Sequence, residues 1–134
     1  MNDKWPSAGV LIVGVFEGDE SAWEQVLGRH SGEEKRVQSV REALKLLQQN
    51  SVRVVICERD LPDGTWKALL ESMAELNDPP ALIVACRLAD ESLWVEVLDA
   101  GGYDVLAWPF DRQEANRTIA LAGRHGSNHR AVAA

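Results

Sequence analysis

Glu58 is the residue of this chain whose type and position are best suited to chemistry. It directly follows an apolar, β-branched run over residues 52–57, and the turn Pro62-Asp63-Gly64 comes shortly after it. Such a run is typical of a buried strand. In open parallel α/β sheets, ligands bind at the carboxyl ends of the strands. A carboxylate at the end of this strand is therefore a candidate site residue.

The elements that must position Glu58 are strand-like apolar runs that alternate with helical patterns. The runs cover residues 9–16, 35–40, 52–57, 81–86 and 103–107, and the helices are expected to begin near residues 19, 40, 63, 90 and 112. This alternation predicts right-handed crossovers and one doubly wound α/β domain, with a parallel sheet between helices on both faces. The polar second run favours an edge strand. We expect residues 9–123 to form the domain, with a leader at 1–8 and a flexible tail at 124–134.

Local signals set the expected helix ends and buried faces. Ser39 is expected to cap the second helix, and Asp63 the helix that follows it in the chain. The pair Gly101-Gly102 is expected to end the fourth helix. The spacing of the apolar residues in the fourth helix predicts an inward stripe formed by Leu93, Trp94, Val97 and Leu98.

Composition limits the kinds of partner. The 134 residues carry 21 acids against 14 bases, which gives a net charge of −7, whereas nucleic-acid binding needs a basic surface. No apolar run approaches the roughly 18 residues of a membrane span, and the leader lacks the apolar core of a signal peptide. Cys57 and Cys86 are too few for a disulfide framework. We therefore expect both to be buried thiols, in a cytoplasmic protein. The alternative is that the two cysteines form a redox pair at the ends of neighbouring strands.

Three segments, in this order and spacing, carry a resemblance to a known family: Leu61-Pro62-Asp63-Gly64, Ala100-Gly101-Gly102 and Trp108-Pro109-Phe110-Asp111. Together they make the chain similar to the receiver domain of bacterial response regulators, over nearly all of residues 9–123. The resemblance implies a CheY-like, flavodoxin-like (βα)5 domain with a five-stranded parallel sheet of order 2-1-3-4-5. It also implies a place in two-component signal transduction.

Receivers accept a phosphoryl group from a histidine kinase on an aspartate. They use an acidic pair after the first strand to hold Mg²⁺, a Thr or Ser after the fourth strand and a Lys after the fifth. The resemblance places other residues at these positions: Glu58 at the acceptor, Gly14 and Val15 at the acidic pair, Ala85 at the hydroxyl, and Trp108, before Pro109, at the lysine.

These replacements remove groups that the chemistry needs. Mg²⁺ prefers hard oxygen ligands, which the side chains of Gly14 and Val15 lack, and Ala85 has no hydroxyl. Phosphoryl transfer also depends on cations that neutralise developing charge, which Trp108 cannot supply. We therefore expect an atypical receiver that is not an enzyme, holds no Mg²⁺ cofactor, and works without phosphorylation by binding a protein partner or a second copy of itself, with no direct contact to nucleic acid or membrane.

Alternatives remain open at the pocket. Glu58 is either a fixed mimic of the phosphorylated state or an acid paired with Arg59 or Arg87, and Arg87 is a candidate replacement for the missing cation. In a second hypothesis, Glu17 and Asp19 fold back to form a non-standard Mg²⁺ site with Asp60, and the domain is phosphorylated after all. A flavodoxin-like small-molecule binder is a third, but the sequence contains no phosphate-binding loop.

The expected docking surface follows from the resemblance. Receivers commonly bind partners through the surface of their fourth helix, fifth strand and fifth helix. In this chain, the candidate residues of that surface are Trp94, Tyr103, Trp108 and Asp111. Trp is enriched among the residues that dominate binding energy at interfaces, so Trp108 is a candidate anchor. The alternatives for Trp108 are that it fills the vacated pocket or covers the core beside Pro109.

Overall fold

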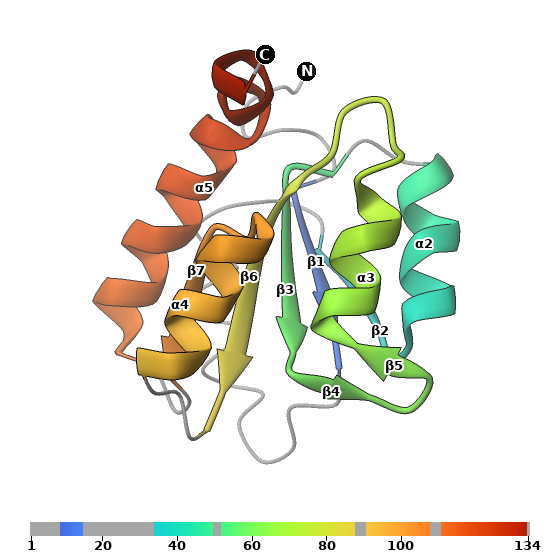
Figure 1. Ribbon diagram of the computed structural model, residues 1–134, viewed down its shortest axis with the longest axis horizontal. Helices are drawn as coiled ribbons and strands as arrows, with labels where there is room; N and C mark the ends of the chain where they lie inside the picture. Colours follow the sequence, from blue (N-terminus) through green and yellow to red (C-terminus); the bar gives the residue numbers. More distant parts are fainter. Residues whose placement is uncertain (1–8, 15–33, 50–51, 88–90, 108–110, 134) are drawn as a thin grey trace.

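The computed structural model describes residues 9–14, 34–49, 52–87, 91–107 and 111–133, and these form an α/β domain (Figure 1). The central strands are β1 (Val10–Val13), β2 (Glu34–Val37), β3 (Val54–Glu58), β6 (Ala81–Cys86) and β7 (Asp104–Ala107), and the helices are α2 (Val40–Gln49), α3 (Trp66–Met73), α4 (Glu91–Ala100) and α5 (Arg112–Ala133). The helix expected to begin near residue 19 and the leader 1–8 lie outside the described residues.

The five central strands form one parallel sheet of order β2-β1-β3-β6-β7. This order is the expected 2-1-3-4-5, so the prediction of a doubly wound sheet is confirmed. The polar strand β2 lies at one edge, as its composition indicated. The order reverses between β1 and β3, which is where open α/β sheets form their binding crevice.

The two faces of the sheet bury alternate residues of each strand, because successive strand side chains point to opposite faces. On one face, Val10, Ile12 and Ile56 pack with Ala115 and Ile119 of α5. On the other face, Leu11, Val55 and Leu82 pack beneath α2, α3 and α4, which lie side by side in Figure 1. Helices therefore cover both faces, and the strands between them are apolar throughout.

The end of α2 that faces Glu58 is fixed by side chains from two segments. Ser39 Oγ accepts a hydrogen bond from the amide of Glu42 at 3.2 Å, as its expected role as a cap requires. Asp63, however, does not cap α3. Its carboxylate accepts hydrogen bonds from the amides of Val40 at 2.9 Å and Arg41 at 3.1 Å, so it caps α2 from across the turn. The α3 cap is Thr65, whose hydroxyl accepts from Ala68.

A short hairpin explains why Asp63 points to α2. Residues 59–65 form a small antiparallel hairpin, β4 (Asp60–Leu61) paired with β5 (Gly64–Thr65), with Asp63 in its turn. The amide of Trp66 donates to the carbonyl of Arg59 and closes the base of the hairpin. This closure moves the cap of α3 two residues along the chain, to Thr65, and leaves Asp63 at the start of α2.

The last helix is longer than expected. We expected it to end near Ala122, but α5 continues to Ala133. Gly123 is buried, and its carbonyl accepts a hydrogen bond from Arg53 Nη1 at 3.0 Å. Gly123 therefore lies inside α5 and contacts the residue before β3, where we had expected it to mark the start of a tail.

The inward stripe of α4 is narrower than expected. Leu93 and Val97 are buried, but Trp94 and Leu98 are 46% and 37% exposed. Gly101, at a positive φ of 106°, ends the helix as predicted, and the amide of Gly102 returns to the carbonyl of Val97 at 2.8 Å.

Candidate functional site

Parallel pairing brings three of the predicted pocket residues to one edge of the sheet. Val13 lies opposite Cys57, so Gly14 and Glu58 each follow a paired residue at the ends of β1 and β3. Glu58 lies opposite Ala85 of β6. Gly14, Glu58 and Ala85 therefore occupy neighbouring places at the carboxyl ends of three adjacent strands, as predicted for a site of this fold.

Glu58 fills the space above Gly14. A Cβ atom added to Gly14 would lie 2.6 Å from Glu58 Cγ and 2.7 Å from Glu58 Oε1. Gly14 also has a positive φ of 137°, a conformation that side-chain-bearing residues rarely adopt. Its amide donates to the carbonyl of Val37 on β2 at 2.8 Å, which fixes this backbone in place. The Glu58 side chain thus lies where a side chain at position 14 would stand.

Two described neighbours of Glu58, Ala85 and Cys57, add no metal ligand to the site. Ala85 is buried and carries only a methyl group. Cys57 is buried, and burial, with a second contribution from the negative charge of Glu58, raises its pKa to about 12. Its thiol donates to the Glu58 carbonyl at 3.0 Å. Cys57 is therefore a neutral thiol at physiological pH. Cys57 and the half-buried Cys86 form no disulfide with each other.

The remaining acids and the candidate cation near this edge lie at the surface. Asp60 is exposed and forms an ion pair with Arg59 at 3.4 Å; exposed pairs of this kind contribute little to stability. Arg87 directly follows β6, and its side chain is exposed. Its pairing with Glu58 stays a prediction.

Asp63 has a structural role at this edge. Its hydrogen bond from the Val40 amide is the main reason that its pKa is lowered, and the bond from Arg41 lowers the pKa further. A carboxylate held by two amides at a helix N-terminus is stabilised in its charged form. We therefore assign Asp63 to capping.

Part of the predicted site lies outside the described residues. Val15, Glu17, Asp19, Trp108 and Pro109 belong to this part, so the non-standard Mg²⁺ site and the place of Trp108 stay predictions. Within the described ranges, no group of three His, Cys, Asp or Glu side chains is arranged to hold a metal ion.

Three of the predicted docking residues belong to the described part of the chain: Trp94 on α4, Tyr103 before β7 and Asp111 before α5. Trp94 is 46% exposed, and its indole Nε1 donates to Asp104 Oδ1 of β7 at 3.3 Å. Tyr103 is half-buried against the core on the α5 side, and burial, followed by the charge of Asp104, raises its pKa. Asp111 is exposed, and its Oδ1 accepts from the amide of Gln113 at 2.9 Å in the first turn of α5.

Sequence reasoning missed two members of this surface. Val95 is 49% exposed and Leu98 37% exposed, and with Trp94 they fall within about 100° of the helix circumference. We call this strip of Trp94, Val95 and Leu98 the α4 face. A sign of it was present in the sequence, because the apolar residues of α4 are too many for a single inward stripe.

The sheet order, the helices on both faces and the acid at the carboxyl end of the third strand of the chain define an α/β domain of the receiver type. The family model of the response regulator receiver domain matches residues 10–120. The chain therefore belongs to the response regulator receiver domain family and is a receiver domain of two-component signalling.

Solved structures agree with this fold. The signal receiver domain of an HD domain-containing protein from Pseudomonas fluorescens Pf-5 superposes with a TM-score of 0.76 at 23% identity, covering 90% of this chain and 97% of that one. The receiver domain of a LuxO repressor protein from Vibrio parahaemolyticus gives 0.80 at 19% identity, covering 94% and 97%. The beryllofluoride-activated NtrC4 receiver domain dimer gives 0.75 at 21% identity, covering 89% and 98%.

The sequence has no match among curated proteins. In the described parts of the chain, none of the helices combines the length and the apolar character that a bilayer span requires.

Proposed function

We propose that this receiver domain works without phosphorylation and signals by docking a protein partner, or a second copy of itself, on its α4–β7–α5 side. It is then a binding module, and it catalyses no reaction. The observation that carries the proposal is the position of Glu58 over Gly14.

A receiver that is phosphorylated needs a metal site and groups that stabilise the phosphoryl group. Mg²⁺ prefers an octahedral set of oxygen ligands, and a phosphoryl group is stabilised by positioned cations and hydrogen-bond donors. Gly14 and Ala85 offer no side-chain oxygen at the two positions where the resemblance places a ligand and a hydroxyl. The Glu58 carboxyl group reaches back over Gly14, into the space that a ligand side chain at position 14 would need.

Glu58 also differs from a phosphorylated aspartate. It carries one negative charge, whereas a phosphoryl group carries about −1.5 to −2 and adds three acceptor oxygens. A permanent carboxylate at this position supports a constant state of the domain, because no kinase or phosphatase step changes it.

The α4 face supports docking, because it exposes apolar side chains. Trp94, Val95 and Leu98 expose a continuous apolar strip, while the indole of Trp94 is held by Asp104 on the adjacent strand. A fixed aromatic side chain loses little conformational entropy on binding, which is why such residues dominate interface energetics. The net charge of −7 supports a protein partner over nucleic acid.

Titration with beryllofluoride and Mg²⁺, followed by tryptophan fluorescence, tests the pocket argument. We expect no saturable, Mg²⁺-dependent change, and the NtrC4 receiver, whose structure is that of a beryllofluoride-activated domain, serves as the positive control. A saturable change abolished by Asp60→Asn would favour the alternative site formed by Glu17, Asp19 and Asp60. A saturable change that persists in Asp60→Asn but is lost in Glu58→Gln would contradict the proposal at Glu58 itself.

A further inference from the structure

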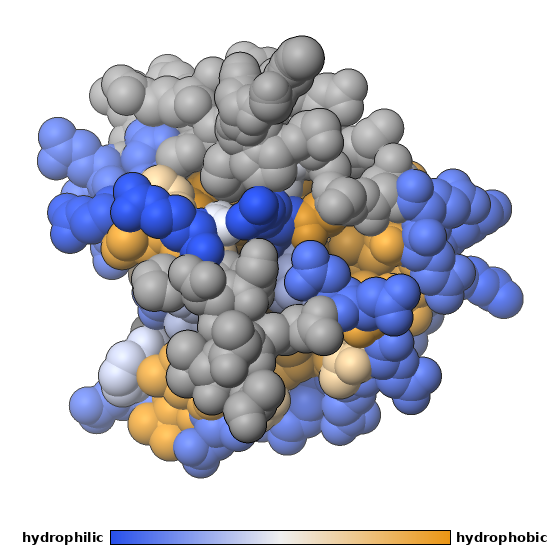
Figure 2. All heavy atoms as spheres, turned by 90° about the horizontal axis from the view of Figure 1, so that it is seen from above, coloured by the Kyte–Doolittle hydropathy of each residue, from blue (hydrophilic) through white to orange (hydrophobic). Residues whose placement is uncertain are grey.

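A groove lies between α2 and α3 at the end of the sheet opposite to Glu58. It has a volume of about 910 Å³, within the range of about 300–1,000 Å³ that is typical of ligand sites. It is lined by Leu44, Leu47, Gln48, Gln49, Val52, Glu71, Ser72, Glu75, Leu76, Asn77, Asp78 and Pro80. Figure 2 looks onto this end of the molecule, where the strands begin, and shows apolar atoms between hydrophilic side chains at the surface.

The packing of the two helices explains why the groove exists. At their N-terminal ends they are joined closely, because Asp63 caps α2 and Gly64 lies next to Val40 of α2 and Ala68 of α3. The groove lies along their C-terminal halves, between residues 44–49 and residues 71–76. It therefore lies away from both the Glu58 pocket and the α4 face.

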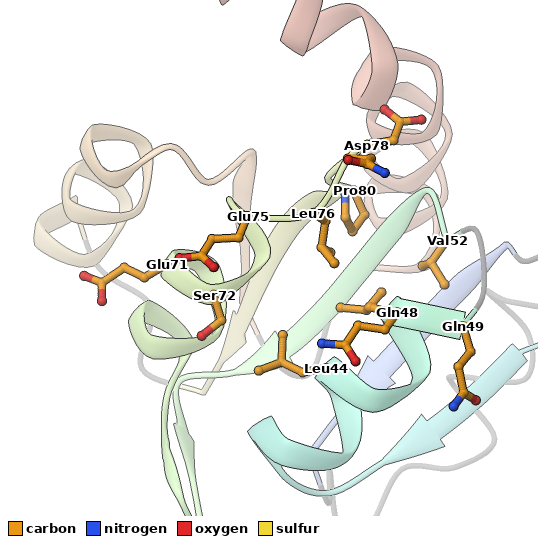
Figure 3. Close-up of a pocket in the computed structure, with 12 residues that line it drawn as sticks. Leu44, Gln48, Gln49, Val52, Glu71, Ser72, Glu75, Leu76, Asp78 and Pro80 are labelled. Carbon is orange, nitrogen blue, oxygen red and sulfur yellow. The ribbon is translucent and has the colours of Figure 1, made fainter.

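The floor of the groove is aliphatic and incompletely covered. Leu44, Val52 and Leu76 are only half-buried, although they pack against the core beneath them. Figure 3 shows Leu44, Leu76 and Pro80 between the helices. An aliphatic side chain placed on this floor would remove further apolar surface from water, which is favourable by about 25 cal/mol per Å².

The rim of the groove is negative. Glu75 and Asp78 stand at its edge, with Glu71 on the outer side of α3, and none of the described residues that line the groove is a Lys or Arg. Both helices end here, and neither carries a basic residue in its last turn. The C-terminal end of a helix carries a partial negative charge that favours cations. The dipoles of α2 and α3 therefore add to the negative potential of the three carboxylates.

From this complementarity we propose that the α2–α3 groove binds a partner protein through a short segment that combines Leu or Val side chains with Lys or Arg. The aliphatic side chains of the segment lie on Leu44, Val52 and Leu76. Its cations lie against Glu75 and Asp78 at the edge of the groove, and Glu71 adds negative charge on the outer side of α3. This inference is independent of whether the Glu58 pocket is phosphorylated.

The test uses the full chain and a synthetic twelve-residue peptide of alternating Leu and Lys, with binding measured by fluorescence anisotropy and mapped by amide NMR shifts. The triple variant Glu71→Gln/Glu75→Gln/Asp78→Asn is compared with Glu91→Gln/Asp99→Asn/Glu114→Gln, which carries the same net charge but changes exposed acids on α4 and α5. We expect the groove variant to bind about tenfold more weakly and the control to bind as the parent does. A second variant, Ser72→Trp, fills the groove without changing charge and is expected to abolish binding.

Three results would overturn the inference. Equal weakening in the two triple variants would show attraction to the net charge alone. Shifts confined to α4 would place the peptide on the other surface. Displacement of the peptide by spermidine at equal charge concentration would assign the groove to small polycations, which make no use of the order of aliphatic and basic side chains.

Discussion

The carboxyl edge of the sheet and the α4 face use their side chains in opposite ways. At the edge, polar groups contact the domain's own backbone: Glu58 lies over Gly14, and Asp63 caps α2 at the surface. On the α4 face, apolar groups that could have been buried are turned outward, with Trp94 held by Asp104. The polar groups at the edge therefore contact the domain itself, whereas the apolar groups of the α4 face are exposed to solvent, as the proposed docking role requires.

The largest effect is expected at Gly14. Gly14→Ala forces a residue with a side chain into a positive φ and places its Cβ against Glu58, so we expect a loss of about 2–4 kcal/mol in the free energy of unfolding. Urea denaturation measures this loss. In Gly14→Ala/Glu58→Ala the steric part is relieved, and the coupling between the two sites should be about 1–2 kcal/mol. Additive effects would mean that Glu58 does not occupy the space above Gly14 in solution.

Two adjacent residues of α4 test the difference between its buried side and its exposed side. Leu93 is buried, so Leu93→Ala should cost about 2–3 kcal/mol of stability. Trp94 is half-exposed, so Trp94→Ala should cost about 1 kcal/mol or less but should weaken docking or self-association about tenfold or more. Thermal unfolding and sedimentation velocity separate the two quantities. If Trp94→Ala unfolds the domain as readily as Leu93→Ala, the α4 face is part of the core.

The cap at Asp63 predicts a pH dependence of stability. Its folded-state pKa is lowered by the amides of Val40 and Arg41, so the carboxylate contributes stability above its ordinary pKa of 3.8. That contribution is lost as the pH falls through the lower, folded-state value. In urea unfolding between about pH 2 and 5, Asp63→Asn should show a smaller acid-induced loss than the parent, whereas Asp60→Asn should behave as the parent does. Identical curves for Asp63→Asn and the parent would remove the cap.

The smallest effect is expected at the exposed bridge between α3 and α4. Lys67 Nζ lies 3.1 Å from Glu96 Oε2, and both side chains are about half-exposed. Because water and salt screen such a pair, Glu96→Gln should change stability by about 0.5 kcal/mol or less. A larger loss in thermal unfolding at physiological salt would mean that polar contacts, and not the buried Leu93 and Val97, position the α4 face.

The sequence predicted the architecture well because its signals were local and repeated. Each local pattern predicted one structural feature: this holds for the apolar runs, the polar edge strand and the glycine pair after α4. The sheet order followed from the family resemblance. The correct placement of Glu58 and Ala85 at neighbouring strand ends follows from the same regularity.

Other features depended on contacts that are distant in the chain. Asp63 has the residue type of a cap, but only the β4–β5 hairpin directs it to α2, 22 and 23 residues away. Gly123 has the residue type of a helix end, but it lies within α5, where its carbonyl accepts a hydrogen bond from Arg53, 70 residues away in the chain. The position of the Glu58 side chain above Gly14 could not be predicted either, because a substitution at one strand end does not show what fills the space at the neighbouring strand end.

The most direct test of the central claim is the intact mass of the domain after incubation with acetyl phosphate and Mg²⁺. We predict that the mass stays that of the unmodified chain, because Glu58 occupies the space above Gly14 and neither Gly14 nor Ala85 offers a side-chain oxygen. The gain of one phosphoryl group, dependent on Mg²⁺ and lost after removal of the metal by EDTA before incubation, would contradict it.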